Sequence, residues 1–115
     1  MGNPVIDEYG DKWWCDSDGK LHRVAGPAVE WSNGTKVWYQ HGTVHRSDGP
    51  TVVYADGHRD WYQHGKLHRT DGPAREWADG DKSWYLHGKN LSFDKWLDQV
   101  DFSDEAKVMM KLKYG

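Results

Sequence analysis

The chain has 115 residues, and its 18 acidic and 15 basic side chains give a formal net charge of −3 at pH 7. This length suits a single domain, 1–115, and the acidic balance argues against direct nucleic-acid binding, which normally needs a basic excess. One cysteine, Cys15, excludes an internal disulfide framework and a cysteine-based zinc site. No apolar stretch reaches the length of a membrane span or a signal-peptide core, so we expect a soluble, cytoplasmic protein without membrane contact.

Residues 1–10 carry no clear pattern, and we expect an arm or an edge strand there. From residue 11 to residue 90 the chain repeats itself in steps of 23 residues. The recurring dipeptides are His-Arg, Gly-Pro, Asn-Gly or Asp-Gly, and Trp-Tyr, and they begin at His22, His45 and His68; at Gly26, Gly49 and Gly72; at Asn33, Asp56 and Asp79; and at Trp38, Trp61 and Trp84. The first unit differs by one inserted residue near Cys15. Several kinds of feature at one constant spacing establish an internal repeat.

Each unit is typical of a β-hairpin. The pairs that begin at Asn33, Asp56 and Asp79 tolerate the two positive φ angles of a type I′ turn, and short runs rich in valine, tryptophan and tyrosine flank them. A two-residue loop would place Trp31 opposite Lys36. We therefore predict a mainly β protein in which three hairpin repeats of 23 residues form an elongated antiparallel sheet.

Because side chains alternate along a strand, this register divides the residues between two faces. The expected tryptophan face carries Val29, Trp31, Trp38, Val52, Tyr54, Trp61, Trp77 and Trp84. The expected tyrosine face carries Tyr39, Tyr62 and Tyr85 with Glu30, Asp60 and Glu76. We expect the tryptophan face to form the core, with the stems of Lys36, Arg59 and Lys82 lying over its rings.

The repeat ends after Gly88, and residues 91–115 have a helical pattern. Ser92 is a candidate N-cap, and Phe93, Trp96, Leu97 and Val100 then fall on one helix face. Ser103 is a second candidate N-cap, followed by an apolar stripe of Ala106, Met109, Met110 and Leu112. A repeat sheet needs its last apolar edge covered, so we predict a two-helix cap over that edge.

The units resemble a known repeat family. The spacing, the hairpin unit and the segment Gly65-Lys66-Leu67-His68 resemble MORN repeats, and residues 38–50 and 61–73 resemble a divergent MORN variant of small phage- and virus-encoded proteins. The resemblance implies an elongated antiparallel sheet with a binding or scaffolding role and no catalytic residues. Arg23, Arg46 and Arg69 stand where the common pattern has glycine, so lipid binding is not carried over.

The histidines and the repeated His-Arg-x-Asp loops are candidates for chemistry. Equivalent histidines in successive hairpins should lie ~10 Å apart, too far to share one zinc ion, although a pair such as His41 with His45 or His64 with His68 could. We predict no metal and no cofactor. Arg46 with Asp48, and Arg69 with Asp71, recur as pairs, which favours a structural role. No nucleophile motif or phosphate loop appears, so we expect no enzymatic activity.

We therefore expect a non-enzymatic protein-binding repeat module, in its sharper form a phage-type inhibitor of a host protein such as a defence nuclease. The predicted partner is another protein with a basic surface, and the sequence is also compatible with a homo-oligomer. One alternative is a carbohydrate or small-ligand binder that stacks rings on exposed aromatic side chains. Another is a small hydrolase with its site in the His-Arg-x-Asp loops.

Specific contacts should lie where the units differ, because shared positions are needed for the fold. The predicted binding residues belong to the tyrosine face and to an acidic face of the first helix, and they are Tyr39, Tyr62, Tyr85, Asp60, Asp94, Asp98 and Asp101. Tyrosines offer a large amphipathic contact area, and the acids would speed the approach of a basic partner.

Overall fold

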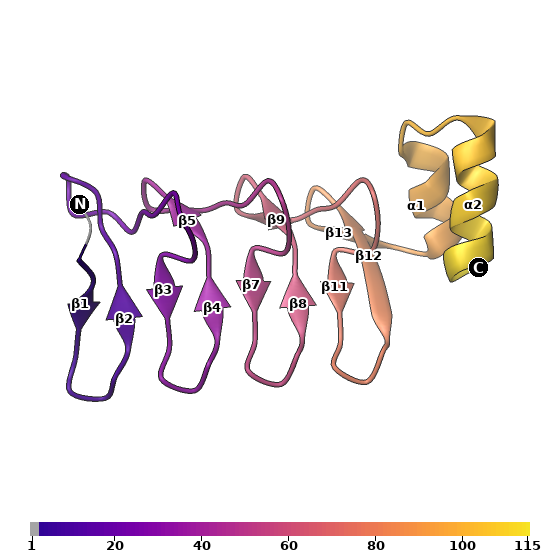
Figure 1. The fold of residues 1–115 in the computed structure, drawn as a ribbon. Helices are drawn as coiled ribbons and strands as arrows, with labels where there is room; N and C mark the ends of the chain where they lie inside the picture. Colours follow the sequence, from indigo (N-terminus) through magenta and orange to yellow (C-terminus); the bar gives the residue numbers. More distant parts are fainter. Residues whose placement is uncertain (1–2) are drawn as a thin grey trace.

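In a computed structural model that describes residues 3–115, nine strands form one antiparallel sheet that ends against two helices (Figure 1). The strands follow in the order β1 (Val5–Ile6), β2 (Lys12–Trp13), β3 (Val29–Glu30), β4 (Lys36–Val37), β7 (Val52–Val53), β8 (Arg59–Asp60), β11 (Arg75–Glu76), β12 (Lys82–Leu86) and β13 (Lys89–Leu91). The molecule measures 49 × 29 × 21 Å. The predicted mainly β, elongated fold with two C-terminal helices is therefore confirmed, and the expected edge strand is β1, which extends the sheet by pairing with β2.

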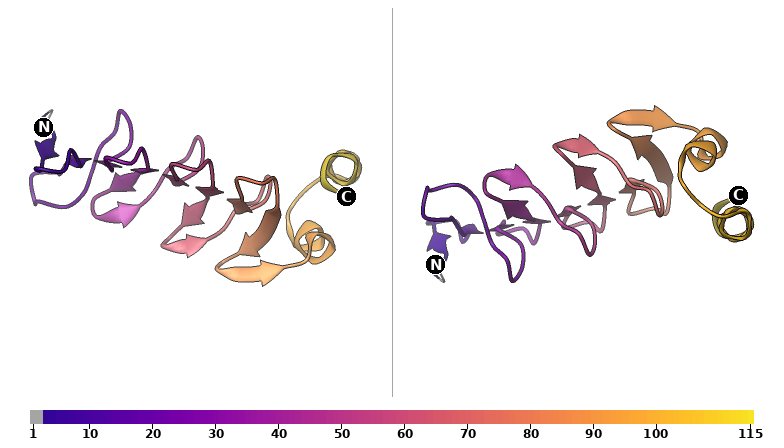
Figure 2. Two further views of the ribbon diagram at one scale, coloured as in Figure 1. Left: turned by 90° about the horizontal axis from the view of Figure 1, so that it is seen from below. Right: turned by 90° about the horizontal axis from the view of Figure 1, so that it is seen from above.

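Two small hairpins lie beside the main sheet. They consist of β5 (Tyr39–Gln40) with β6 (Thr43–Val44), and of β9 (Tyr62–Gln63) with β10 (Lys66–Leu67). Seen along the strands, these hairpins project to one side of the sheet, whereas the loops that follow them project to the other (Figure 2). Each repeat thus contributes to two faces.

The main hairpins turn through three-residue loops. The Trp31 amide donates to the Thr35 carbonyl at 2.8 Å, and the Gly34 amide donates to the Trp31 carbonyl at 2.9 Å. Gly34 has a φ of 98°, while Asn33 is not among the non-glycine residues with positive φ, and its side chain accepts the Thr35 amide. The predicted two-residue type I′ turn at Asn33-Gly34 is therefore wrong.

The type I′ turns lie instead at the His-Gly pairs. His41, His64 and His87 have φ values of 49°, 52° and 52°, and each is followed by a glycine with positive φ. Tyr39 pairs with Val44 and Gln40 with Thr43, which leaves a two-residue loop between them. This turn type requires positive φ at both central positions.

The longer loop shifts the register by one residue, which moves the second strand's side chains to the opposite face. Val29 pairs with Val37, and Glu30 pairs with Lys36. The front face therefore carries the row Lys12, Glu30, Lys36, Val53, Arg59, Glu76 and Lys82. The rear face carries the row Trp13, Val29, Val37, Val52, Asp60, Arg75 and Ser83.

Other cations than those predicted lie over the tryptophans. The guanidinium carbon of Arg23 lies 3.7 Å from the ring centre of Trp14, and those of Arg46 and Arg69 lie 3.9 Å from the rings of Trp38 and Trp61. Lys36, Arg59 and Lys82 instead share the front-face row with Glu30 and Glu76, so the prediction that they cover the rings is wrong.

The helices cover the end of the sheet beside β12 and β13. They are α1 (Phe93–Gln99) and α2 (Asp104–Tyr114), with the predicted N-caps Ser92 and Ser103. Trp84 packs against Trp96 with ring centres 4.5 Å apart, inside a buried cluster with Leu86, Leu97 and Val100. On α2, Met109 and Leu112 are exposed, so only part of its predicted apolar stripe packs. The helices lie at the end of the sheet and over neither of its broad faces (Figures 1 and 2).

The positive φ of the histidine turns gives a first test. Replacing His64 by valine should destabilise the protein by about 1–2 kcal/mol, because a β-branched residue is disfavoured in this conformation. His64→Asn should stay close to the wild type, since asparagine tolerates positive φ. Urea unfolding of both variants measures the difference, and equal losses would contradict the turn assignment.

Candidate functional site

The rear face contains an apolar depression at its N-terminal half. Six side chains surround a volume of about 240 Å³, and they are Trp13, Leu21, Val29, Trp31, Val37 and Tyr39. The Trp31 side of this depression is open, since 46% of that residue is accessible to solvent. The structure thus places the predicted contact residue Tyr39 beside an exposed tryptophan that was expected in the core.

Further along the rear face, a charged network fills the equivalent position. Asp60 is fully buried and receives two hydrogen bonds from Arg75, Nε to Oδ1 at 3.0 Å and Nη2 to Oδ2 at 3.3 Å. His58 Nε2 lies 2.7 Å from Oδ1, and the Tyr54 hydroxyl donates to Oδ2 at 3.4 Å. Asp60 therefore cannot serve as the surface contact that was predicted, and it lies on the opposite face from Glu30 and Glu76.

Aromatic rings enclose this network. The imidazole of His58 lies between Tyr54 and Trp77, with ring centres 4.7 and 4.2 Å away. Burial raises the pKa of Tyr54, and the negative charge of Asp60 adds to the effect. The pKa of Tyr62 is raised for the same two reasons. Tyr62 and Tyr85 are half-buried, so the predicted tyrosine contacts keep part of their surface accessible.

The His-Arg-x-Asp loops are held by their arginines. Arg46 Nε donates to Asp48 at 2.9 Å and its Nη1 to the Pro50 carbonyl at 3.0 Å, and Arg69 repeats both contacts. The hydrogen bond from Arg46 lowers the pKa of the Asp48 carboxyl. The predicted pairing of Arg46 with Asp48 and of Arg69 with Asp71 is confirmed, and a structural role for these pairs stays a prediction. A polar hollow of about 510 Å³ separates the loops of Arg23 and Arg46. The arginine contacts hold the loops in place, and they give no support to the hypothesis of a small hydrolase.

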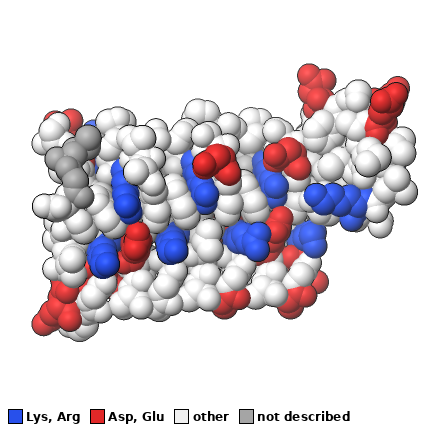
Figure 3. All heavy atoms as spheres, viewed as in Figure 1, with Lys and Arg blue, Asp and Glu red and all other residues white. Residues whose placement is uncertain are grey.

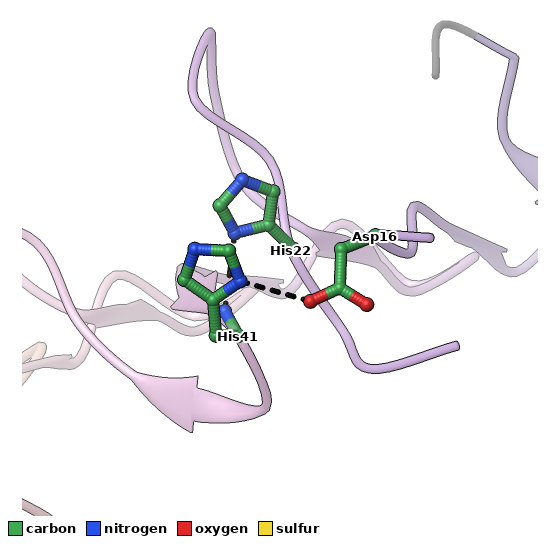
Figure 4. Close-up of side chains that lie close together, drawn as sticks. All are labelled: Asp16, His22 and His41. Atoms are coloured by element: carbon green, nitrogen blue, oxygen red, sulfur yellow. Dashed lines mark hydrogen bonds and ion pairs between the residues drawn. The ribbon is translucent and has the colours of Figure 1, made fainter. Parts of the chain in front are cut away.

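Asp16, His22 and His41 form the metal-compatible cluster found among residues 3–115, with one donor atom of each within 4.8 Å of the others (Figure 4). The inserted residue of the first unit lengthens the loop after Asp16, whose Oδ1 accepts the amides of Asp18 and Lys20. Its Oδ2 lies 2.9 Å from His41 Nδ1. The hydrogen bond with His41 is the main cause of the lowered pKa of Asp16.

The two imidazoles of this cluster serve as a contact between units. Their rings stack with centres 4.1 Å apart, and His22 Nδ1 accepts the His41 amide at 3.1 Å, which occupies the lone pair that a metal would need. His68 and His87 form the same contact, with the amide of His87 donating at 2.9 Å. The histidine pairs therefore join successive units, unlike the His41–His45 or His64–His68 pairs that the sequence suggested.

The acidic helix residues are accessible. Asp94 and Asp98 on α1 and Asp101 just beyond it are all exposed, as predicted.

Within residues 3–115, no helix is long and apolar enough to cross a membrane. Comparison of the chain with models of known families, with curated proteins and with solved structures found no match. The resemblance to MORN repeats therefore stays a prediction.

Burial separates two aspartates that both pair with arginine. Asp60→Ala should cost about 3–5 kcal/mol, because Arg75 would lose the partner of a buried ion pair. Asp71→Ala should cost at most about 1 kcal/mol, since its side chain is 77% exposed. Chemical denaturation measures both values, and similar costs would contradict the distinct roles.

The His68 contact predicts a pH dependence. Burial, together with His87 and His64, lowers the pKa of His68 below its ordinary value of 6.5. The unfolded chain therefore binds the proton more readily, so this contribution to stability is complete above that value and is lost on acidification. We expect the melting temperature to fall between about pH 7 and pH 5, and to fall less in His68→Asn, which keeps an acceptor for the His87 amide. His45→Asn is the control, because His45 is exposed and is not among the causes of this shift, and an unchanged pH profile in His68→Asn would refute the assignment.

Proposed function

We propose that this chain is a non-enzymatic protein-binding repeat module. The observation that carries the proposal is the apolar depression around Trp31, on a broad sheet face that the helices leave uncovered. Exposed tryptophan and tyrosine are enriched among residues that dominate binding energy, and an apolar hollow lets a partner's side chain leave water. A rigid elongated sheet needs little reorganisation on binding.

The acidic residues suggest the character of the partner. Asp94, Asp98 and Asp101 are exposed at the helical end of the molecule, and their charge would attract a protein with a basic surface. The two surfaces would then have different roles. The depression around Trp31 would contribute most of the binding energy, and the acids would raise the association rate. A nucleic-acid-binding host protein would have such a basic surface. This chain would then act as its inhibitor, the role suggested by the resemblance to small phage proteins.

Stacking of a carbohydrate is the second candidate. Trp31 and Trp77 are 46% and 40% exposed, and flat sugar faces stack on such rings. The two candidates differ in the role of the acids, because a neutral sugar does not respond to their charge.

Affinity capture from lysate of the source cell or its host tests the proposal. Trp31→Ala should weaken capture of the partner by about tenfold or more. Reversing the charges of Asp94, Asp98 and Asp101 together should weaken it at low salt, with a smaller loss at high salt. Tyr9→Ala is the matched control, since Tyr9 is a 72% exposed aromatic residue that does not line the depression. Undiminished capture by both variants would refute the proposed surface, and binding to immobilised glycans that depends only on Trp31 would favour the second candidate.

A further inference from the structure

The front face shows how this repeat neutralises its loop arginines. Glu30 Oε2 accepts a hydrogen bond from Arg23 Nη1 at 3.2 Å, and Glu76 Oε2 accepts one from Arg69 Nη1 at 3.1 Å. The other oxygen of Glu76 lies 3.8 Å from Arg59 Nη1. In both units, a carboxylate from the sheet therefore lies beneath the loop arginine and beside the cations of neighbouring strands.

The middle unit lacks this carboxylate. Val53 stands 23 residues after Glu30 and 23 before Glu76. It pairs with Lys36 on one side and with Arg59 on the other, just as Glu76 lies between Arg59 and Lys82. Figure 3 shows the result as a row of alternating blue and red side chains that is interrupted near its centre.

Among the three loop arginines of residues 3–115, Arg46 is the one without a hydrogen bond to an acid of the sheet. Its Nε donates to Asp48 and one Nη1 hydrogen donates to the Pro50 carbonyl, whereas its counterparts Arg23 and Arg69 also use Nη1 to reach a glutamate. Asp48 offsets the charge only in part, because its side chain is 83% exposed. The ring of Trp38 holds the guanidinium 3.9 Å above it, so the fork is already oriented.

We propose that the surface over Val53, between Lys36, Arg46 and Arg59, is a binding site for an external oxyanion. The group that fits is a carboxylate or a phosphate, and it takes the place that the carboxylates of Glu30 and Glu76 occupy in the neighbouring units. Arginine forks match the geometry of such groups, and a bond between two charged partners is stronger than a neutral one. The site is independent of the depression around Trp31, which lies on the opposite face.

NMR titration tests the proposal. The signals to follow are the Arg46 Nε–H and the Val53 amide, and the probes are sodium acetate and inorganic phosphate, with sodium chloride keeping the ionic strength constant. We expect saturable shifts at Arg46 that exceed those at Arg23 and Arg69. The probe that binds more tightly, acetate or phosphate, assigns the preferred group.

Val53→Glu supplies the missing acid and should weaken probe binding by about tenfold or more, because its own carboxylate then occupies the site. This variant should fold, since glutamate occupies the equivalent positions 30 and 76. Val53→Leu is the matched uncharged control and should bind like the wild type, while Glu76→Val should create a second responsive site at Arg69. The proposal is wrong if neither probe gives saturable shifts, if Val53→Glu binds as the wild type does, or if the three arginines respond equally.

Discussion

The stacking of one arginine on one tryptophan in each unit is the contact on which the repeat depends. The guanidinium of Arg46 covers Trp38 and at the same time donates to the Pro50 carbonyl, so it fastens the loop to the sheet. A side-chain carbon at Gly49 would come within 2.8 Å of this guanidinium, which explains why glycine precedes the proline. The His-Arg, Gly-Pro and Trp-Tyr pairs, which look independent in the sequence, are therefore parts of one contact.

Histidines join these units along the chain. His22 and His68 accept the backbone amides of His41 and His87, which are the first residues of type I′ turns in the next unit. His41 and His87, both with positive φ, thus place their own amides where a histidine of the preceding unit accepts them. The arginine–tryptophan contact therefore acts within a unit, and the histidine contact acts between units.

The sequence predicted the repeat, the elongated antiparallel sheet, the helix caps and the accessible acids of α1. It did not predict the register, because Asn-Gly and Asp-Gly pairs suit both two-residue and three-residue hairpin loops, and only the pattern of hydrogen bonds distinguishes them. The one-residue difference in loop length is the reason why Asp60 was expected on the same face as Glu30 and Glu76, whereas it lies on the opposite one. The type I′ turns at the His-Gly pairs were not predicted, because His-Gly is not among the dipeptides typical of this turn.

The charged network around Asp60 could have been found from differences between units. Val29 and Val52 are followed in the repeat by Arg75, and Val37 is followed by Asp60 and then Ser83. A basic and an acidic residue that replace valines at positions paired across neighbouring strands predict a mutual contact, and the register confirms that Asp60 faces Arg75. Comparison of units therefore contains information that motif searching does not.

The same comparison separates charges that the chain satisfies internally from those it leaves open. Arg75 and Asp60 both stand where another unit has valine, and they bond to each other, so these two differences add a cation together with its acid. Val53 removes an acid while the cations around it stay, so that change leaves a surface with fewer acids than cations. Its internal partners are the exposed Asp48, paired with Arg46, and Glu76, which Arg59 shares with Arg69. Burial explains why the two cases differ. Loss of the fully buried Asp60 would leave Arg75 without its partner at a large cost in stability. On the front face Lys36 and Arg59 are exposed, so solvent lowers the cost of the missing carboxylate.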